Sequence, residues 1–375
     1  MILLIIIITL FVSYAILMIY YWISWMAVPD FVPRPAASNQ QTGLKLSVVI
    51  PARNEEKNIG RLLEALQKQS YPPSLFEIIV ADDHSTDKTT GIAATFKEVK
   101  IIPVPGEEIN SYKKKALETA ITQSAGEWII TTDADCLPGK DWLHTIVSFI
   151  NEKGPVFITA PVSFMESPGI LGVFQSLDFM ILQGITAASV HKKFFPMCNG
   201  ANLAYRRDAF YEVEGFAGID HIASGDDMLL MEKFWKKYPG RVLYLRARGA
   251  IVSTMPMLSW KDFFNQRIRW ASKSKHYKTK KILAVLSLVY LFNLSFLAAG
   301  IAGFFDERYW MMLVALWLGK TLVEQPFVWS VAGFYGKRKL LYSFFFLQPV
   351  HIIYTIVSGF LGLFGKYEWK GRQVK

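Results

Sequence analysis

Two patterns of hydrophobic residues follow one another along the chain. Between residues 44 and 150, short apolar runs alternate with amphipathic segments whose apolar residues recur with the helical period. Strands are predicted at 46–50, 77–81, 99–104 and 128–130, and helices at 58–69, 88–97, 113–124 and 141–150. Strands that alternate with helices predict an α/β fold whose mostly parallel sheet is covered on both faces.

Beyond Pro155 the alternation is less regular. A further strand is predicted at 156–161, a mainly apolar amphipathic segment at 169–190, a loop at 198–202 and a helix at 226–238. The last helix begins with two carboxylates, which are favourable at the positive end of a helix. We therefore expect the α/β domain to cover residues 44–255.

The second pattern consists of long apolar segments without charged residues. Met1–Val28 and Ile282–Phe305 contain no Asp, Glu, Lys or Arg, and each exceeds the roughly 20 residues that cross a bilayer as a helix. We expect an N-terminal transmembrane anchor at 1–28, a proline-containing linker at 29–43 and C-terminal membrane segments at 281–365.

Residues 256–280 interleave large aromatic residues with Lys and Arg. This mixture is typical of a helix that lies in the membrane interface, and the apolar span that starts at Ile282 follows at once. An ordinary helix docked on the α/β domain is the alternative.

The last membrane segments carry polar residues. Lys320 and Glu324 fall near the middle of the apolar segment 309–334. Ionisable groups at membrane depth often mark function, but residues four apart also pair with each other on a helix, and we favour that explanation. Segment 340–364 is expected to break at Pro349 and re-enter, because a full crossing would place the basic tail 366–375 outside, against the positive-inside rule.

Composition agrees with a membrane protein. Hydrophobic residues make up 52% of the chain and charged residues 19%, which is too apolar for an ordinary soluble protein. The net charge is +10, but two of the basic clusters, 267–281 and 337–339, flank apolar spans. This placement favours anionic lipid head groups over nucleic acid, which we do not expect as a partner. With only two cysteines, no disulfide framework is implied and a reducing compartment fits.

Candidate chemistry lies in the loops after the predicted strands. Because parallel strands end at the same edge of a sheet, the groups Pro51–Glu56, Asp82-Asp83, Asp133/Asp135 and Asp226-Asp227 can converge there. Two close carboxylates such as Asp133 and Asp135 repel each other, and a divalent cation relieves that repulsion. Taken alone, D-x-D fits a metal site or an acidic turn equally well. Neither a dinucleotide fingerprint, nor a P-loop, nor a nucleophile elbow is present.

These motifs, in this order, resemble the membrane-bound glycosyltransferases of family 2, which have the GT-A fold. The resemblance covers about residues 46–270. It is carried by Pro51-Ala52-Arg53-Asn54-Glu55, Asp82–Asp87, Lys113 with Ala116-Leu117, Asp133-Ala134-Asp135, Asn199-Gly200-Ala201-Asn202, Asp227 and Gln266-Arg267-Ile268-Arg269-Trp270. The last is a full Q-x-x-R-W, typical of the branch with cellulose, chitin and hyaluronan synthases and ceramide glucosyltransferase. At His84 this chain departs from the family, where glycine is commoner.

The resemblance implies a metal-dependent hexosyltransferase and a role for each matched residue. A divalent cation, Mg²⁺ or Mn²⁺, would be held by Asp135 with the help of Asp133. Asp227 would be the catalytic base that takes the acceptor proton. The implied substrate-binding residues are Pro51, Arg53, Glu55, Asp83, Lys113, Asp133, Asn202, Asp226, Gln266, Arg269 and Trp270. Which of Lys113, Lys114 and Lys115 matters stays open.

Single residues also have plainer explanations. Asp227 is placed to cap the helix that follows it, and Asp82 to play a structural role beside Asp83. Arg269 is also suited to contact lipid phosphate, and Trp270 to anchor the chain at the membrane interface.

Together these observations predict an inverting transfer from a nucleotide-diphospho-sugar, with UDP-sugar favoured, to a membrane lipid. Only about three C-terminal segments are available to enclose a polysaccharide channel, so we favour a lipid acceptor. A processive polysaccharide synthase is the alternative. A non-catalytic membrane scaffold of the same fold is the second alternative. The expected location is a bacterial inner membrane, with the domain at 44–255 and the tail in the cytoplasm.

Overall fold

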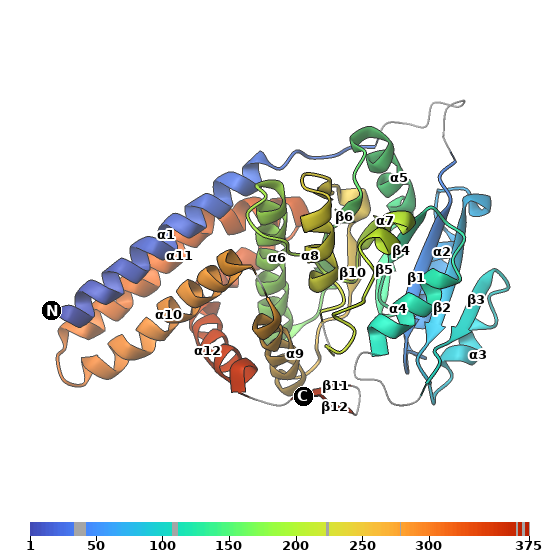
Figure 1. Cartoon of the computed structure of the whole chain (residues 1–375). Coiled ribbons are helices and arrows are strands. Elements are labelled where there is room, and N and C mark those ends of the chain that lie inside the picture. The colour runs from blue at the N-terminus through green and yellow to red at the C-terminus, as the bar shows by residue number, and fades with distance from the viewer. Residues whose placement is uncertain are drawn as a thin grey trace. The chain divides into compact units, whose positions relative to one another are not determined.

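The computed structural model describes residues 1–33, 43–106, 112–222, 225–277, 279–364, 367–369 and 372–374 (Figure 1). The chain divides into two compact units. The α/β unit comprises 29–165 and 196–255, and the helical unit comprises 1–28, 166–195 and 256–375. The expected domain at 44–255 is thus interrupted, since residues 166–195 pack with the helical unit.

A seven-stranded mixed sheet forms the centre of the α/β unit, in the order β3-β2-β1-β4-β8-β6-β9. Its strands are β1 (Leu46–Ala52), β2 (Phe76–Asp82), β3 (Val99–Pro103), β4 (Trp128–Thr131), β6 (Phe157–Thr159), β8 (Leu203–Arg206) and β9 (Val242–Tyr244). Strands β1 to β4 are parallel, whereas β8 runs antiparallel to β4 and β6. The predicted α/β class with a mixed, mostly parallel sheet is confirmed.

A second, three-stranded sheet has the order β5-β10-β7. Its strands are β5 (Cys136–Pro138), β7 (Val162–Phe164) and β10 (Val252–Thr254). The pairing of β5 with β10 is antiparallel and sets Cys136 opposite Thr254. Asp133 and Asp135 therefore lie in the short connection between the two sheets, from the end of β4 to the start of β5.

Helices of the α/β unit follow the predicted alternation. They are α2 (Ile59–Gln67), α3 (Thr89–Ala93), α4 (Tyr112–Thr122), α5 (Trp142–Lys153), α7 (Arg207–Glu212) and α8 (Met228–Lys237), with short 3₁₀ turns η1 (Pro73–Leu75) and η2 (Arg248–Ala250). In α2 the apolar residues Ile59, Leu62, Leu63 and Leu66 are all fully buried, so the periodicity identified the packed face. Helix α3 is shorter than the predicted 88–97.

Among the residues that the structure describes, six longer helices belong to the helical unit. They are α1 (Ile2–Ala27), α6 (Gly169–His191), α9 (Trp260–Ser272), α10 (Lys280–Gly303), α11 (Arg308–Tyr335) and α12 (Phe344–Phe364), with 3₁₀ segments η3 (Lys273–His276) and η4 (Arg338–Ser343) and the hairpin β11 (Tyr367–Trp369)–β12 (Arg372–Val374). Helix α1 runs alongside α11 (Figure 1), with Trp25 packed edge-on against Phe334. Among the described residues, five helices are long and apolar enough to cross a membrane: α1, α6, α10, α11 and Arg338–Leu363.

Pro349 does not end the last helix, so the predicted break at this residue is wrong. Helix α12 continues through Pro349 to Phe364. Proline has no N–H for the carbonyl four residues earlier, which belongs to Phe345. That carbonyl instead accepts a hydrogen bond of 3.3 Å from the indole Nε1 of Trp317 on α11. A side chain on the neighbouring helix α11 thus satisfies the carbonyl that proline leaves open.

Candidate active site

The parallel register brings three loops to one edge of the sheet. Ala52, at the end of β1, pairs with Asp82 at the end of β2, and Val49 of β1 pairs with Thr131 at the end of β4. The loops that begin after Ala52, Asp82 and Thr131 therefore leave the sheet at the same edge. This is the edge at which the sequence predicted the candidate groups to converge.

Arg53 ties the first two loops together. Its Nη1 donates to the backbone oxygen of Asp83 at 2.7 Å and lies 3.7 Å from the carboxylate of that residue. His84 adopts a φ of 54°, and its Nδ1 lies 3.2 Å from Asp83 Oδ1. Such a left-handed backbone favours glycine, so His84 keeps the loop shape that glycine would allow, while its ring adds a contact with the Asp83 carboxylate.

Asp82 is the residue in this loop that the sequence reasoning undervalued. One of its carboxylate oxygens accepts a hydrogen bond from the Ser85 backbone at 3.2 Å. The other, Oδ1, is buried and has no partner among the described residues. A buried acceptor without a donor is costly, so this oxygen suits a ligand N–H group. Adjacent aspartates look equivalent in a motif, and only the fold distinguishes them.

Lys113 lies at the centre of the acidic groups. Its Nζ lies 2.7 Å from Asp133 Oδ1 and 3.2 Å from Asp226 Oδ2. The two neighbouring lysines point elsewhere: Lys114 donates to the backbone oxygen of Ile222, and Lys115 pairs with Glu118 at 3.5 Å. Of the three lysines that the sequence left open, Lys113 is the one that meets the carboxylates.

Electrostatics keep Lys113 charged. Burial by itself lowers the pKa of a lysine, but the carboxylates of Asp133 and Asp226, and more weakly that of Asp227, raise the pKa of Lys113 well above its usual value. The cluster therefore contains a permanent cation that neutralises only part of the surrounding negative charge.

Asp135 is the carboxylate that this cation leaves uncompensated. Burial, then repulsion from Asp133 and Glu55, raises the pKa of Asp135 to about 6. Its Oδ2 accepts a hydrogen bond of 3.2 Å from Thr254 Oγ1 on β10, which fixes the side chain. A carboxylate destabilised in this way gains from a nearby divalent cation.

The donor set fits such a cation when substrate shares its coordination. No group of three or more His, Cys, Asp or Glu that could hold a metal occurs among the residues the structure describes. Mg²⁺ commonly binds through one or two carboxylates and completes its shell with water and substrate phosphates. Asp135 and Asp133 match that pattern of few protein ligands.

Asp227 both caps a helix and reaches the cluster. Its Oδ1 accepts from the backbone N–H of Met228 at 2.7 Å, so the capping explanation holds for α8. Its Oδ2 accepts from the N–H of Gly200 at 3.2 Å, which brings the loop at 198–202 beside Asp226 and Asp227. A Cβ at Gly200 would lie 3.2 Å from both Lys113 Nζ and Asp226 Oδ2, so a side chain here crowds the cluster.

Asn202 does not have the substrate-binding geometry expected of it, and its assignment is corrected. The residue is fully buried. Its Nδ2 donates to the carbonyls of Pro161 and Ala250, both at 2.8 Å, and its Oδ1 accepts from Trp142 Nε1 at 3.0 Å. Because its amide nitrogen and oxygen both bond to the protein, Asn202 stabilises the loop at 198–202.

Glu55 and Pro51 fall where the first loop begins. Pro51 is the penultimate residue of β1 and pairs with Ala81. The N–H of Glu55 donates to Thr89 Oγ1 at 2.7 Å, and its Oε2 accepts from Asn58 at 2.9 Å. Glu55 is held at the start of α2 and contributes negative charge near Asp135.

Gln266, Arg269 and Trp270 belong to α9 of the helical unit. The ring of Trp270 packs on the guanidinium of Arg267 at 4.1 Å and near Phe179 at 6.0 Å. The sequence reasoning treated Arg267 as one of several basic residues. No signal in the sequence indicated that Arg267 is buried, because its ion-pair partner, Asp178, lies 89 positions away in the chain.

The structure resembles a solved enzyme of the same architecture. The mannosyltransferase PcManGT from Pyrobaculum calidifontis, solved in complex with GDP-Man and Mn²⁺, superimposes with a TM-score of 0.60. The match is 20% identical and covers 96% of this chain and 99% of that chain. At this level of identity the likeness establishes the fold: a GT-A-like α/β domain accompanied by apolar helices.

Sequence comparison points to the same class of enzyme. Residues 47–214, less than half of the chain, match the model of glycosyl transferase family 2. Glycosyltransferase AglE of Haloferax volcanii is 32% identical over 187 residues, which cover 49% of this chain and 59% of that protein. The probable glycosyltransferase YdaM of Bacillus subtilis is 27% identical over 269 residues, 68% of this chain and 63% of that protein. The chain thus spans less than two thirds of the length of either relative.

Proposed function

We propose that this protein is a membrane-bound, inverting glycosyltransferase that transfers a sugar from a nucleoside-diphosphate sugar to a membrane lipid. The observation that carries the proposal is the cluster around Lys113, where Asp133 and Asp226 are bridged by one cation while Asp135 stays in excess. Such a site suits a second, divalent cation and the diphosphate that this cation would bind.

The proposed roles follow from the charges in the cluster. A bound Mg²⁺ or Mn²⁺ would act as a Lewis acid that neutralises the diphosphate leaving group. Asp135 would hold it with the assistance of Asp133, while Lys113 keeps Asp133 and Asp226 in place. Arg53 and Asp83, together with the buried oxygen of Asp82, would hold the nucleotide at the neighbouring loops.

Asp227 is proposed as the general base. Both of its oxygens accept backbone hydrogen bonds, which fix the carboxylate without neutralising it. A fixed carboxylate suits removal of a proton from an acceptor hydroxyl. A single displacement by that oxygen, on the face opposite the diphosphate, inverts the anomeric carbon.

UDP-sugars remain the expected donors, and GDP-sugars are the second class to test. The solved relative PcManGT is in complex with GDP-Man, although its 20% identity does not transfer that preference to this chain. Nothing in the Arg53 and Asp83 contacts selects one base over the other.

The membrane location is proposed from the helical unit. Lys280 and Lys281 begin α10, and Lys337, Arg338 and Lys339 follow α11. A Cβ at Gly300 would touch Leu313 and one at Gly303 would touch Trp310, so α10 and α11 form an antiparallel pair with all five cations at one end. By the positive-inside rule this end faces the cytoplasm, and we propose the cytoplasmic membrane of a bacterium.

Helix α12 is proposed to re-enter rather than cross. Near its start, Phe345 stacks on Trp317 within α11 at 4.5 Å, and near its end Gly362 lies against Ala271 of α9. Ala271 precedes the basic start of α10, so the end of α12 returns to the cytoplasmic end. A cysteine at Gln373 should then stay inaccessible to an impermeant thiol reagent in intact cells. Labelling there would contradict the topology.

The transfer assay tests the function itself. The purified chain is placed in vesicles of phosphatidylethanolamine and phosphatidylglycerol that contain diacylglycerol. It is then incubated with Mn²⁺ and radiolabelled UDP-glucose, UDP-N-acetylglucosamine or GDP-mannose. A lipid-soluble product with one sugar supports the proposal. A long polymer supports a processive synthase, for which Q-x-x-R-W at Gln266–Trp270 is the encouraging feature.

Variants make the result specific to the site. Asp135→Asn should remove metal-dependent transfer, whereas Asp141→Asn, an aspartate at the start of α5 outside the cluster, should not. Nucleotide binding without transfer from any donor would favour the non-catalytic scaffold.

A further inference from the structure

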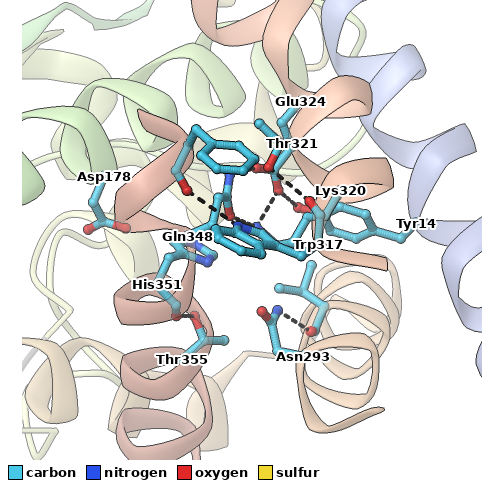
Figure 2. A network of polar contacts seen from close by, with 12 residues as sticks. Tyr14, Asp178, Asn293, Trp317, Lys320, Thr321, Glu324, Gln348, His351 and Thr355 are labelled. Atoms are coloured by element: carbon cyan, nitrogen blue, oxygen red, sulfur yellow. Dashed lines mark hydrogen bonds and ion pairs between the residues drawn. The ribbon is translucent and has the colours of Figure 1, made fainter. Parts of the chain in front are cut away.

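A buried polar network occupies the interior of the helical unit (Figure 2). Lys320 on α11 is fully buried and donates to Glu324 at 2.7 Å and to Gln348 of α12 at 2.5 Å. Gln348 in turn donates to Glu324 at 2.6 Å, and Tyr14 of α1 donates to the same carboxylate. The pairing of Lys320 with Glu324 that the sequence favoured is present, and it is one part of a junction between three helices.

A second buried polar centre lies further along α12. Asp178 of α6 and Arg267 of α9 form an ion pair at 2.7 Å, with side chains only 4% and 3% exposed. Tyr354 of α12 donates to Asp178 at 2.6 Å. This centre joins α6, α9 and α12 in the way that Lys320 joins α1, α11 and α12.

One face of α12 connects the two centres. Gln348, His351 and Tyr354 are three residues apart in turn, a spacing that places side chains on the same face of a helix. The rings of His351 and Tyr354 meet edge-on at 5.3 Å. His351 lies between Gln348 and Tyr354 along this face of the helix. The polar side chains of α12 are therefore arranged as a stripe.

Arg267 links the second polar centre to side chains of the Q-x-x-R-W segment. Its guanidinium lies 4.1 Å from the ring centre of Trp270, and its Nη1 donates to Gln266 at 3.1 Å. Gln266 and Trp270 thus contact Arg267, and Arg267 pairs with Asp178, which accepts the hydrogen bond from Tyr354. Burying an ion pair is expensive, and such pairs are best attested where they set registry.

We propose that the polar stripe Gln348–His351–Tyr354 positions α9: it holds Asp178 against Arg267, and Arg267 fixes the orientation of Trp270 and Gln266. Asp178, Arg267 and Tyr354 are positioning residues, since they act through the Q-x-x-R-W side chains. The consequence for sugar transfer rests on the proposed function, whereas the consequence for the orientation of α9 does not.

Spin-label distances test the positioning directly. Labels are attached to cysteines at two exposed positions, Lys261 on α9 and Phe346 on α12, while the native Cys136 and Cys198 are buried. Tyr354→Phe removes the hydroxyl that bonds Asp178 but keeps the ring packed against Phe263 at 5.5 Å. We expect one narrow distance distribution in the starting chain and a broadened or shifted one in Tyr354→Phe. An unchanged distribution would overturn the proposal.

The matched control is Tyr342→Phe, which removes the same group from a side chain that is 86% exposed. It should leave the distance distribution unchanged. If both tyrosine variants broadened the distribution equally, the effect would not come from the Asp178 contact, and the proposal would fail.

Replacement of the ion pair separates positioning from mere stability. Arg267→Met with Asp178→Leu leaves no unpaired buried charge, so the chain should still fold. Binding of Mn²⁺ alone, whose proposed ligands Asp133 and Asp135 belong to the α/β unit, should be retained, while transfer falls by about 100-fold because small misplacements are costly. If the double variant kept full transfer and an unchanged label distance, the ion pair would contribute only to the stability of the fold, and the proposal that it positions α9 would be wrong.

These readouts also separate this inference from the proposed function. If the starting chain transfers no sugar, the proposed function fails, but the label distances still decide the inference. If it transfers sugar and the distances do not respond to Tyr354→Phe, only the inference fails.

Discussion

Lys113 and Lys320 both pair with carboxylates, in two regions that differ in their charge balance. Lys113 in the α/β unit meets Asp133 and Asp226, and its side chain is 23% exposed. Lys320 in the helical unit is fully buried and meets Glu324 and Gln348. The same residue type therefore takes part in an accessible cluster and in a closed network.

The difference lies in what remains unsatisfied. Around Lys113, further carboxylates from Asp135 and Asp227 leave the region negative, and the pKa of Asp135 is raised to about 6. Around Lys320, one carboxylate balances one cation, and the remaining groups, Gln348 and Tyr14, are neutral. Excess charge that is reachable from solvent indicates a binding site, whereas balanced charge in the interior indicates a joint between helices.

The largest effect is expected for the proposed base. Asp227→Asn should lower the transfer rate by about 100- to 10,000-fold, the usual contribution of a general base. Asparagine caps helices as well as aspartate does, so α8 and nucleotide binding should persist. Transfer rates and Mn²⁺–nucleotide titrations measure the two effects. Asp208→Asn, in an exposed pair with Arg206, is the matched control, and wild-type turnover in Asp227→Asn would refute the assignment.

The closed network should respond through stability. Glu324→Ala leaves the buried cation of Lys320 unpaired and should cost about 3–5 kcal/mol of unfolding free energy. The double variant Lys320→Met with Glu324→Leu should regain part of that loss, because no lone charge remains although Gln348 and Tyr14 lose their partners. Unfolding in detergent measures both. If Glu324→Ala were as stable as the starting chain, the network would not join the helices.

Metal affinity should depend on pH through Asp135. With a pKa of about 6, this carboxylate is mostly ionised above that pH and binds Mn²⁺ without losing a proton. Below it, binding must displace one proton, so affinity should fall about tenfold per pH unit. The metal-free protein should show the opposite trend: the raised folded-state pKa of Asp135 contributes stability at low pH that is lost as pH rises through about 6. Calorimetric Mn²⁺ titrations of the starting chain at pH values on both sides of 6 measure this affinity, and an affinity that does not fall below that pH would contradict the prediction.

Removal of the Lys113 charge should change the Mn²⁺ affinity by a smaller factor, and the direction of that change tests the charge balance of the cluster. Lys113→Met deletes one positive charge beside Asp133 and should tighten Mn²⁺ binding roughly tenfold, an estimate from Coulomb energies of about 1–4 kcal/mol near a protein surface. Lys115→Met, whose partner Glu118 is on the helix surface, should change nothing. Weaker Mn²⁺ binding in Lys113→Met would contradict the description of the cluster as carrying excess negative charge.

Much of the fold was predictable because the relevant signals are local. Alternation of apolar strands with amphipathic helices predicted the parallel strands β1 to β4, and uncharged apolar runs predicted α1 and α10. Helix α6 was predicted only as an apolar segment inside the α/β domain, yet it packs with the helical unit. Its partners come from α1 and α11, which lie far away in the chain.

Within the site, residue types were predictable and individual roles were not. D-x-D, the paired aspartates after β2 and the lysine-bearing helix were all visible as motifs. That Lys113 rather than Lys114 meets the carboxylates depends on the rotation of α4. That the amide of Asn202 binds only the protein depends on Trp142, 60 positions away in the chain.

The sequence by itself determined the class of this protein: strand and helix periods, apolar spans and ordered acidic motifs are properties of neighbouring residues. Tertiary structure alone decided which charges are compensated. Lys113 and Lys320 are chemically identical, and each is close to a carboxylate. Only the packing of distant elements surrounds one with surplus negative charge at the edge of a sheet and closes the other within a balanced network between helices.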